Sequence, residues 1–194
     1  GRRVAGGRQA DAVAAARQSA KHPQGLIHEI FLPAAQALSA RTIFSWVGGM
    51  FNWDQLSLLK GLSPEQVVRL LALMVDLPRL GMNGEAMLAV IAGEHVQAVI
   101  DLIGQRFLHE RETGDFRYED LPHGLHYLQK PLAAAPVKIV AAARQWFDRD
   151  PSFSQFRGGR LIAQLFPNLK DPLYPLLYSQ VEQGREGIDF VLSV

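Results

Sequence analysis

The sequence contains no cysteine among its 194 residues. That absence excludes disulfide scaffolds, cysteine-ligated zinc, iron–sulfur clusters and thiol catalysis. Neither sign of charge dominates, since 20 lysines and arginines stand against 19 aspartates and glutamates. Bulk charge therefore gives no argument for binding nucleic acid or an anionic membrane, and any basic surface must be local.

Long uninterrupted apolar runs are also missing. The apolar stretch at residues 67–75 is broken by Arg69, whereas a membrane span needs roughly 18 to 20 apolar residues in succession. The chain is nevertheless 48% hydrophobic, which is enough to bury a sizeable core. We expect a soluble, cytoplasmic protein without a membrane partner. Because the sequence starts with Gly1 and stops within an apolar helical pattern, we also expect a fragment of a larger protein.

Helical patterns occupy almost the whole sequence. Ser63-Pro64-Glu65-Gln66 is a capping-box start, with a serine N-cap and a proline in the first turn. Apolar residues then recur at helical spacing over residues 67–75, 94–111 and 137–147, and shorter helices are expected over 160–166, 172–183 and from 187 onward. No segment sustains the alternation of apolar and polar residues that strands show. The sequence predicts an all-α fold.

Several of these features recur at one fixed offset of 40 residues. The matching pairs are Phe107/Phe147, Phe116/Phe156, Arg117/Arg157, Leu121/Leu161 and Leu125/Leu165. A period near 40 with two antiparallel helices per unit is typical of α-solenoids, in which each pair covers the apolar face of the next. Residues 63–194 therefore resemble the HEAT and armadillo class of helical repeats, although residues 63–93 form a shorter unit and the last unit is incomplete.

The resemblance implies a right-handed α-solenoid of antiparallel helix pairs that presents an extended surface to a partner. Helical repeats of another kind and an irregular bundle remain open alternatives. The texture of the segment is also similar to the helical sensor regions that follow nucleotide-binding domains in large bacterial defence ATPases. That similarity implies a bacterial protein whose ATPase lies outside this sequence.

Residues 116–128, F-R-Y-E-D-L-P-H-G-L-H-Y-L, raise the question of a metal site. On one continuous helix, Glu119, His123 and His126 would share a face. Asp120 precedes Leu-Pro, however, so we expect Asp120 to be a helix N-cap that leaves Glu119 outside the helix. Three or four clustered ligands are needed for a metal. His123 and His126 are therefore only weak metal candidates and are interpreted as structural or surface residues.

No catalytic motif is complete in this sequence. His28-Glu29 lacks the second histidine of a zinc-protease motif, because Leu32 occupies that position. The glycine pairs at 48–49 and 158–159 lack the lysine of a phosphate loop and are predicted to mark helix boundaries. With no G-x-S-x-G segment either, we expect a non-enzymatic chain without a cofactor.

Charge is unevenly distributed along the chain. Residues 85–120 contain eight acidic and three basic side chains, whereas residues 138–170 contain six basic and two acidic ones. Arg144, Arg149, Arg157 and Arg160, with aromatic residues among them, would suit a groove that holds phosphates and stacks bases. The competing interpretation, which we favour, is that the aromatic residues are core and the arginines are solvated or pair with Asp148 and Asp150.

Residues 42–56 carry an unusual density of aromatic side chains, including Trp46 and Trp53. These residues would either cover the open end of a repeat array or anchor a partner. We therefore divide the chain into an N-terminal helical and aromatic cap, 1–62, and a helical repeat array, 63–194. The expected function is a scaffold or sensor segment that binds another protein or another domain of its parent chain. The alternatives are a nucleic-acid-binding repeat that uses the four arginines and a metal-assisted enzyme centred on His123 and His126.

Overall fold

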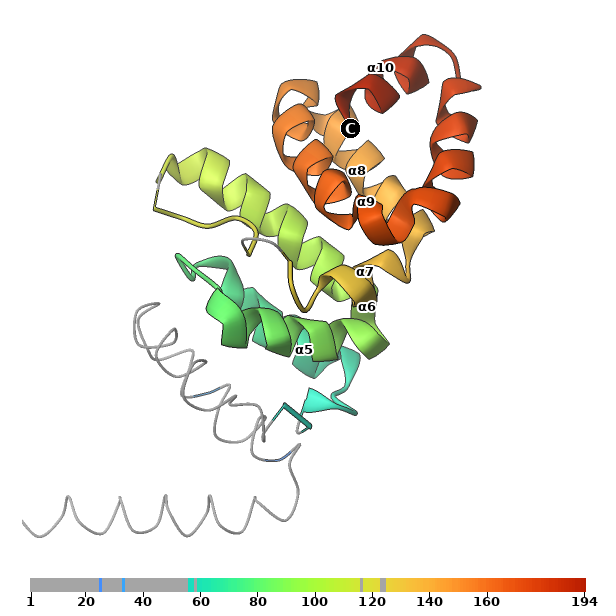
Figure 1. The fold of residues 1–194 in the computed structure, drawn as a ribbon. Helices are drawn as coiled ribbons and strands as arrows, with labels where there is room; N and C mark the ends of the chain where they lie inside the picture. The colour runs from blue at the N-terminus through green and yellow to red at the C-terminus, as the bar shows by residue number, and fades with distance from the viewer. Residues whose placement is uncertain (1–24, 26–32, 34–55, 58, 116, 123–124) are drawn as a thin grey trace, which may run out of the picture.

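A computed structural model describes residues 25, 33, 56–57, 59–115, 117–122 and 125–194, with the backbone alone at 151–156 and 170. Trp46, Trp53 and the glycine pair at 48–49 lie outside the described residues, as does almost all of the expected N-terminal cap. The helices are α5 (Pro64–Val75), α6 (Gly81–Thr113), α7 (Gln129–Ala133), α8 (Pro136–Arg149), α9 (Pro151–Val181) and α10 (Arg185–Ser193). The described residues contain no strand, so the all-α prediction is confirmed for them (Figure 1).

The start of α5 follows its sequence signals. The Ser63 hydroxyl accepts a hydrogen bond from the backbone N–H of Gln66 at 3.3 Å, and the Gln66 side chain accepts one from the Ser63 N–H at 2.9 Å. This reciprocal pair satisfies two donors that a helix start otherwise leaves open. One face of α5 is then buried through Val67, Leu70 and Met74, each no more than 1% exposed. The predicted capping box is confirmed.

Helix α6 is longer than the sequence pattern predicted. It begins at Gly81 rather than near Glu94, and a kink at His95, where φ is −128° and ψ is 48°, divides it. The helix ends as expected at Gly114, which adopts the left-handed conformation at φ 62° and donates its N–H to the carbonyl of Glu110. Glycine suits this C-terminal position because it has no side chain to clash.

By length and composition alone, α6 could also cross a membrane. The most apolar window of Gly81–Thr113 has a mean hydropathy of 1.6, but 50% of that window is buried inside the protein. The core helix of a soluble protein meets the same criterion, so this finding is weak support for a membrane span. No other helix in the described part of the chain meets it.

The helix expected to begin after Asp120 does not form. Residues 117–122 and 125–128 are non-helical, Leu125 has a positive φ of 45°, and α7 covers only Gln129–Ala133. The physical reason is tertiary, because Asp120 is used for ion pairs with α9 instead of capping a helix. The N-cap prediction was wrong.

Helix α9 also differs from its prediction. A single helix, Pro151–Val181, replaces the two shorter helices expected over 160–166 and 172–183, and it contains Pro167, Pro172 and Pro175. Proline removes a hydrogen-bond donor and bends a helix, and the second part of α9 takes a different direction from the first (Figure 1). The glycine pair at 158–159 lies inside α9 and marks no boundary.

Gly159 instead permits a close helix contact. A β-carbon placed there would lie 2.9 Å from the Ser193 carbonyl oxygen near the end of α10. Such a distance is too short for a side chain and a rigid backbone atom. The glycine was therefore misinterpreted from the sequence, since its role depends on a residue 34 positions away that no local pattern identifies.

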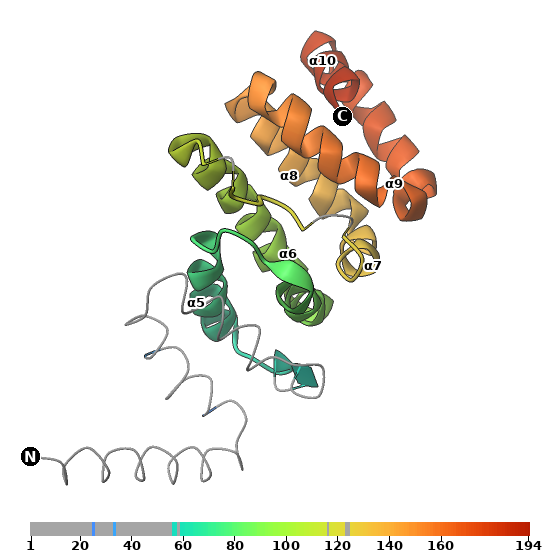
Figure 2. The same ribbon diagram turned by 60° about the vertical axis from the view of Figure 1, so that its left-hand side comes forward.

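The helices pack in an order that follows the chain. Helix α5 packs on α6, α8 packs on α9, and α10 packs on α9. The pair α5 and α6 meets the group of α8, α9 and α10 where α6 contacts α8, and α7 contacts α9 beside them. At the first of these contacts the ring centres of Phe107 and Trp146 lie 5.1 Å apart in an edge-to-face arrangement. Helices α5 and α10 lie at opposite ends of this assembly (Figure 2).

The 40-residue period is not confirmed by this arrangement. Leu121 lies in the non-helical connection after α6, whereas its counterpart Leu161 lies within α9. Arg117 likewise lies in that connection, and its counterpart Arg157 lies within α9. The all-α class therefore holds in the described residues, while the solenoid remains a prediction.

Candidate functional site

A completely buried arginine, Arg106, fastens α6 to the segments around it. Its guanidinium donates to the carbonyl oxygens of Met74 at 2.5 Å, Val75 at 3.4 Å, Leu77 at 2.9 Å, Asp120 at 3.1 Å and Glu119. Met74 and Val75 lie in the last turn of α5, where carbonyls lack helical partners and the helix dipole is negative, and Leu77 follows the helix. Burial lowers the pKa of Arg106, although Tyr118, Asp120 and Glu119 oppose that effect. Arg106 therefore acts as a structural clasp.

Tyr118 completes this clasp. The Arg106 guanidinium carbon lies 4.4 Å from the centre of the Tyr118 ring, and the Tyr118 hydroxyl donates to the Val75 carbonyl oxygen. Burial raises the pKa of Tyr118 to about 12. The hydroxyl thus remains protonated at neutral pH, which keeps it a hydrogen-bond donor.

A second buried charge, Glu85, orders the connection before α7. Only 2% of Glu85 is exposed, and its Oε1 accepts hydrogen bonds from the backbone N–H groups of Tyr127 at 2.6 Å and Leu128 at 3.1 Å. These contacts join the start of α6 to a segment more than 40 residues later. A buried carboxylate needs such partners to offset its loss of hydration.

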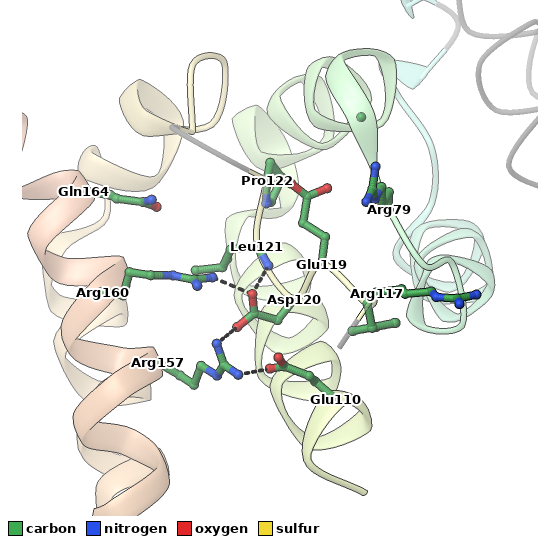
Figure 3. Close-up of a pocket in the computed structure, with 12 residues that line it drawn as sticks. Arg79, Glu110, Arg117, Glu119, Asp120, Leu121, Pro122, Arg157, Arg160 and Gln164 are labelled. Carbon is green, nitrogen blue, oxygen red and sulfur yellow. Dashed lines mark hydrogen bonds and ion pairs between the residues drawn. The ribbon is translucent and has the colours of Figure 1, made fainter. Parts of the chain in front are cut away.

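Asp120 is the centre of an ion-pair cluster between this connection and α9 (Figure 3). Its Oδ2 lies 3.1 Å from Arg157 Nη1, and its Oδ1 pairs with Arg160 Nη2. Arg157 also pairs with Glu110 of α6. Burial, followed by the charge of Asp120, raises the pKa of Glu110, while Arg157 and Arg160 lower it. The cluster joins α6, the connection and α9.

A polar cavity of about 640 Å³ opens beside this cluster. It is lined by Arg79, Gly81, Glu110, Arg117, Tyr118, Glu119, Asp120, Leu121, Pro122, Arg157, Arg160 and Gln164. Carboxylates already neutralise the two arginines of α9, and the lining contains neither a serine nor a histidine to serve as nucleophile or base. The ion pairs beside the cavity connect α6, the connection after α6 and α9.

The histidine candidates do not form a metal centre in the described structure. His126 is exposed in the turn before α7, and His123 lies outside the described residues. Among the residues whose placement is described, no three histidine, aspartate or glutamate side chains are grouped to hold an ion. The metal interpretation therefore gains no support.

The four candidate arginines do not converge on one groove. Arg144 pairs with Asp148 at 2.7 Å, as the competing interpretation predicted, and also reaches Glu186 at 3.7 Å. Arg157 and Arg160 belong to the Asp120 cluster, and Arg149 is exposed at the end of α8. Asp150, the other expected partner, forms an ion pair with Arg111 of α6.

An exposed apolar surface that sequence reasoning missed lies on α9. Phe166 is 39% exposed, Tyr174 60%, Tyr178 72% and Val181 36%. We call these four residues the α9 aromatic surface. The signal was present in the sequence, because Tyr174, Tyr178 and Val181 follow one helical face and are offset from Leu173.

The residues sequence reasoning missed are thus of two kinds. Arg106 and Glu85, together with the ion-pairing role of Asp120, connect segments distant in the chain, and the α9 aromatic surface is exposed. Protein-family models, curated proteins and solved structures were all compared with the chain, and none matches it.

Proposed function

We propose that this chain is a non-enzymatic helical scaffold or sensor segment that binds another protein or another domain of its parent chain. The observation that carries the proposal is the exposure of aromatic side chains on α9, with Tyr174 60% and Tyr178 72% exposed. Tyrosine is enriched at protein interfaces, where it supplies a large apolar ring and one hydrogen-bonding group. Contiguous exposed apolar side chains mark interaction sites.

The use made of the buried charges supports a non-enzymatic role. Arg106 and Glu85 bind backbone groups of neighbouring segments, and Asp120 binds two arginines. A catalytic site needs polar groups directed toward a substrate instead. These three residues direct their charges into the fold.

A helical-repeat architecture of the HEAT or armadillo kind remains part of the proposal. Its support is that α5, α6, α8, α9 and α10 each pack mainly on helices near them in the chain, as in stacked helical arrays. We also propose a cytoplasmic, bacterial sensor setting, on the sequence resemblance alone.

Nucleic-acid binding is the alternative proposal. Arg149 and Lys138 are both exposed on α8, so phosphate contacts are available to them. Against this alternative, Arg157 and Arg160 are engaged by Asp120. A phosphate-binding surface would show affinity that falls steeply with salt.

The test is capture of host-lysate components on the purified chain, with and without nuclease. Any protein retained after nuclease is then purified, and its affinity for the chain is measured directly. Saturable binding of one purified protein supports the scaffold proposal. Recovery of nucleic acid alone, lost on Lys138→Glu with Arg149→Glu, would overturn it. This pair is preferable to changes at Arg157 and Arg160, because those arginines also hold the fold together.

A further inference from the structure

We infer that the α9 aromatic surface is a docking site for a basic segment of a partner protein, one rich in lysine or arginine with apolar residues between them. This inference rests on the proposed protein-binding function and assigns it a location and a partner chemistry. The docking site lies on α9 between Phe166 and Val181 and includes none of the candidate arginines.

The geometry of α9 separates this surface from the core. Leu173 is fully buried, whereas Asp171, Tyr174, Tyr178 and Glu182 are all exposed. Steps of three and four residues place these four on one helical stripe. The two tyrosines therefore lie between two carboxylates on the solvent side of the helix.

Phe166 extends the stripe across the bend in α9. Its ring lies 6.1 Å from the Tyr174 ring, in an edge-to-face arrangement with an interplanar angle of 84°. Pro167 and Pro172 lie between them, and proline restricts the backbone. The contact between the Phe166 and Tyr174 rings restricts these two side chains before a partner binds, which lowers the entropy lost on binding.

The charge around the surface selects the partner. Asp171 and Glu182, both exposed, flank the two tyrosines on the stripe, whereas Glu186 of α10 is already paired with Arg144. The Asp171 and Glu182 carboxylates attract cations and repel phosphates and anionic lipids at short range. Exposed tyrosine rings add cation–π attraction for arginine and lysine. Both effects favour a basic peptide segment.

The experiment selects a displayed library of random peptides on the wild-type chain and on Tyr174→Ser with Tyr178→Ser. The control is Val68→Ser with Val137→Ser, which removes side chains that are 61% and 63% exposed elsewhere. All three proteins are first compared by circular dichroism. We expect peptides rich in lysine and arginine to be selected by wild type and control, and to bind the tyrosine variant at least about tenfold more weakly.

A second variant tests the charge. Asp171→Lys with Glu182→Lys is expected to weaken the same peptides and to flatten the salt dependence of their affinity. Selection of acidic or neutral peptides, equal binding to the tyrosine variant, or no selection on wild type would each overturn the inference. A protein partner that binds the tyrosine variant unchanged would also overturn it while leaving the scaffold proposal intact.

Discussion

Replacing Arg106 with methionine is expected to destabilise the chain strongly. The guanidinium is completely buried and donates to five carbonyl oxygens, two in the last turn of α5, one at Leu77 just after it and two in the connection after α6. Methionine is an unbranched apolar side chain with good helix propensity, so it occupies the space of the arginine stem without disturbing α6. The change therefore isolates the loss of the charged donors.

The magnitude follows from two opposing effects. A buried polar group left without a partner costs about 1–3 kcal/mol. The Val75 carbonyl keeps its hydrogen bond from the Tyr118 hydroxyl, so the four other carbonyls give a sum of about 4–12 kcal/mol as an upper bound. Water entering the space of the guanidinium reduces this cost, and removal of a buried charge returns its desolvation penalty. We expect a net loss of about 3–5 kcal/mol in the free energy of unfolding, as for other broken buried charge contacts.

The assay is urea unfolding followed by far-ultraviolet circular dichroism, with Arg69→Met as control. Arg69 is exposed on α5, so its replacement should change the unfolding free energy by no more than about 0.5 kcal/mol. Arg106→Lys should lose less than Arg106→Met, because an ammonium keeps the charge and supplies three donors. If Arg106→Met does not fold, Arg106→Lys carries the test. A change within about 1 kcal/mol for Arg106→Met, equal to that of its control, would refute the clasp.

Three further predictions concern contacts of single residues. Gly159→Ala should lower the free energy of unfolding by about 1–3 kcal/mol, because its β-carbon would lie 2.9 Å from a backbone oxygen. At Gly93 a β-carbon would meet no atom within 4 Å, so Gly93→Ala should raise the free energy of unfolding by about 0.5–1 kcal/mol. Thermal unfolding of the two variants measures both changes. Asp120→Asn should lower the free energy of unfolding in urea by about 3 kcal/mol, because it breaks two ion pairs. Asp189 is exposed, so Asp189→Asn serves as the control and should change that free energy by about 0.5 kcal/mol or less. The pKa of Glu110 is raised above its usual 4.5, so the folded protein binds a proton at Glu110 more readily than the unfolded chain does. The stability that this proton adds is present at low pH and lost as pH rises, so wild type should gain stability relative to Glu110→Gln as pH falls from 7 toward 4.5. A difference in unfolding free energy that stays constant with pH would contradict this prediction.

Local signals predicted the parts of the fold that depend on local chemistry. The capping box at Ser63 and the left-handed glycine at Gly114 satisfy backbone groups of their own helices, so a few neighbouring residues suffice to identify them. Arg106 and Asp120 gave no such signal, because their partners are contributed by segments distant in the chain. Asp120 even carried a misleading one, since Asp before Leu-Pro is also a common helix start.

The 40-residue coincidences have a physical explanation that requires no repeat. Leu121 and Leu161 are 2% and 0% exposed, and Leu125 and Leu165 are both fully buried. The first member of each pair nevertheless lies in a non-helical connection and the second in α9. In these two leucine pairs burial recurs at the 40-residue offset while secondary structure does not, whereas Phe107 and Phe147 are both buried in helices, α6 and α8. Apolar spacing therefore reports which residues must leave water, and two segments can meet that demand with different backbones. A repeat requires matching helix boundaries as well, which the sequence pattern alone did not supply.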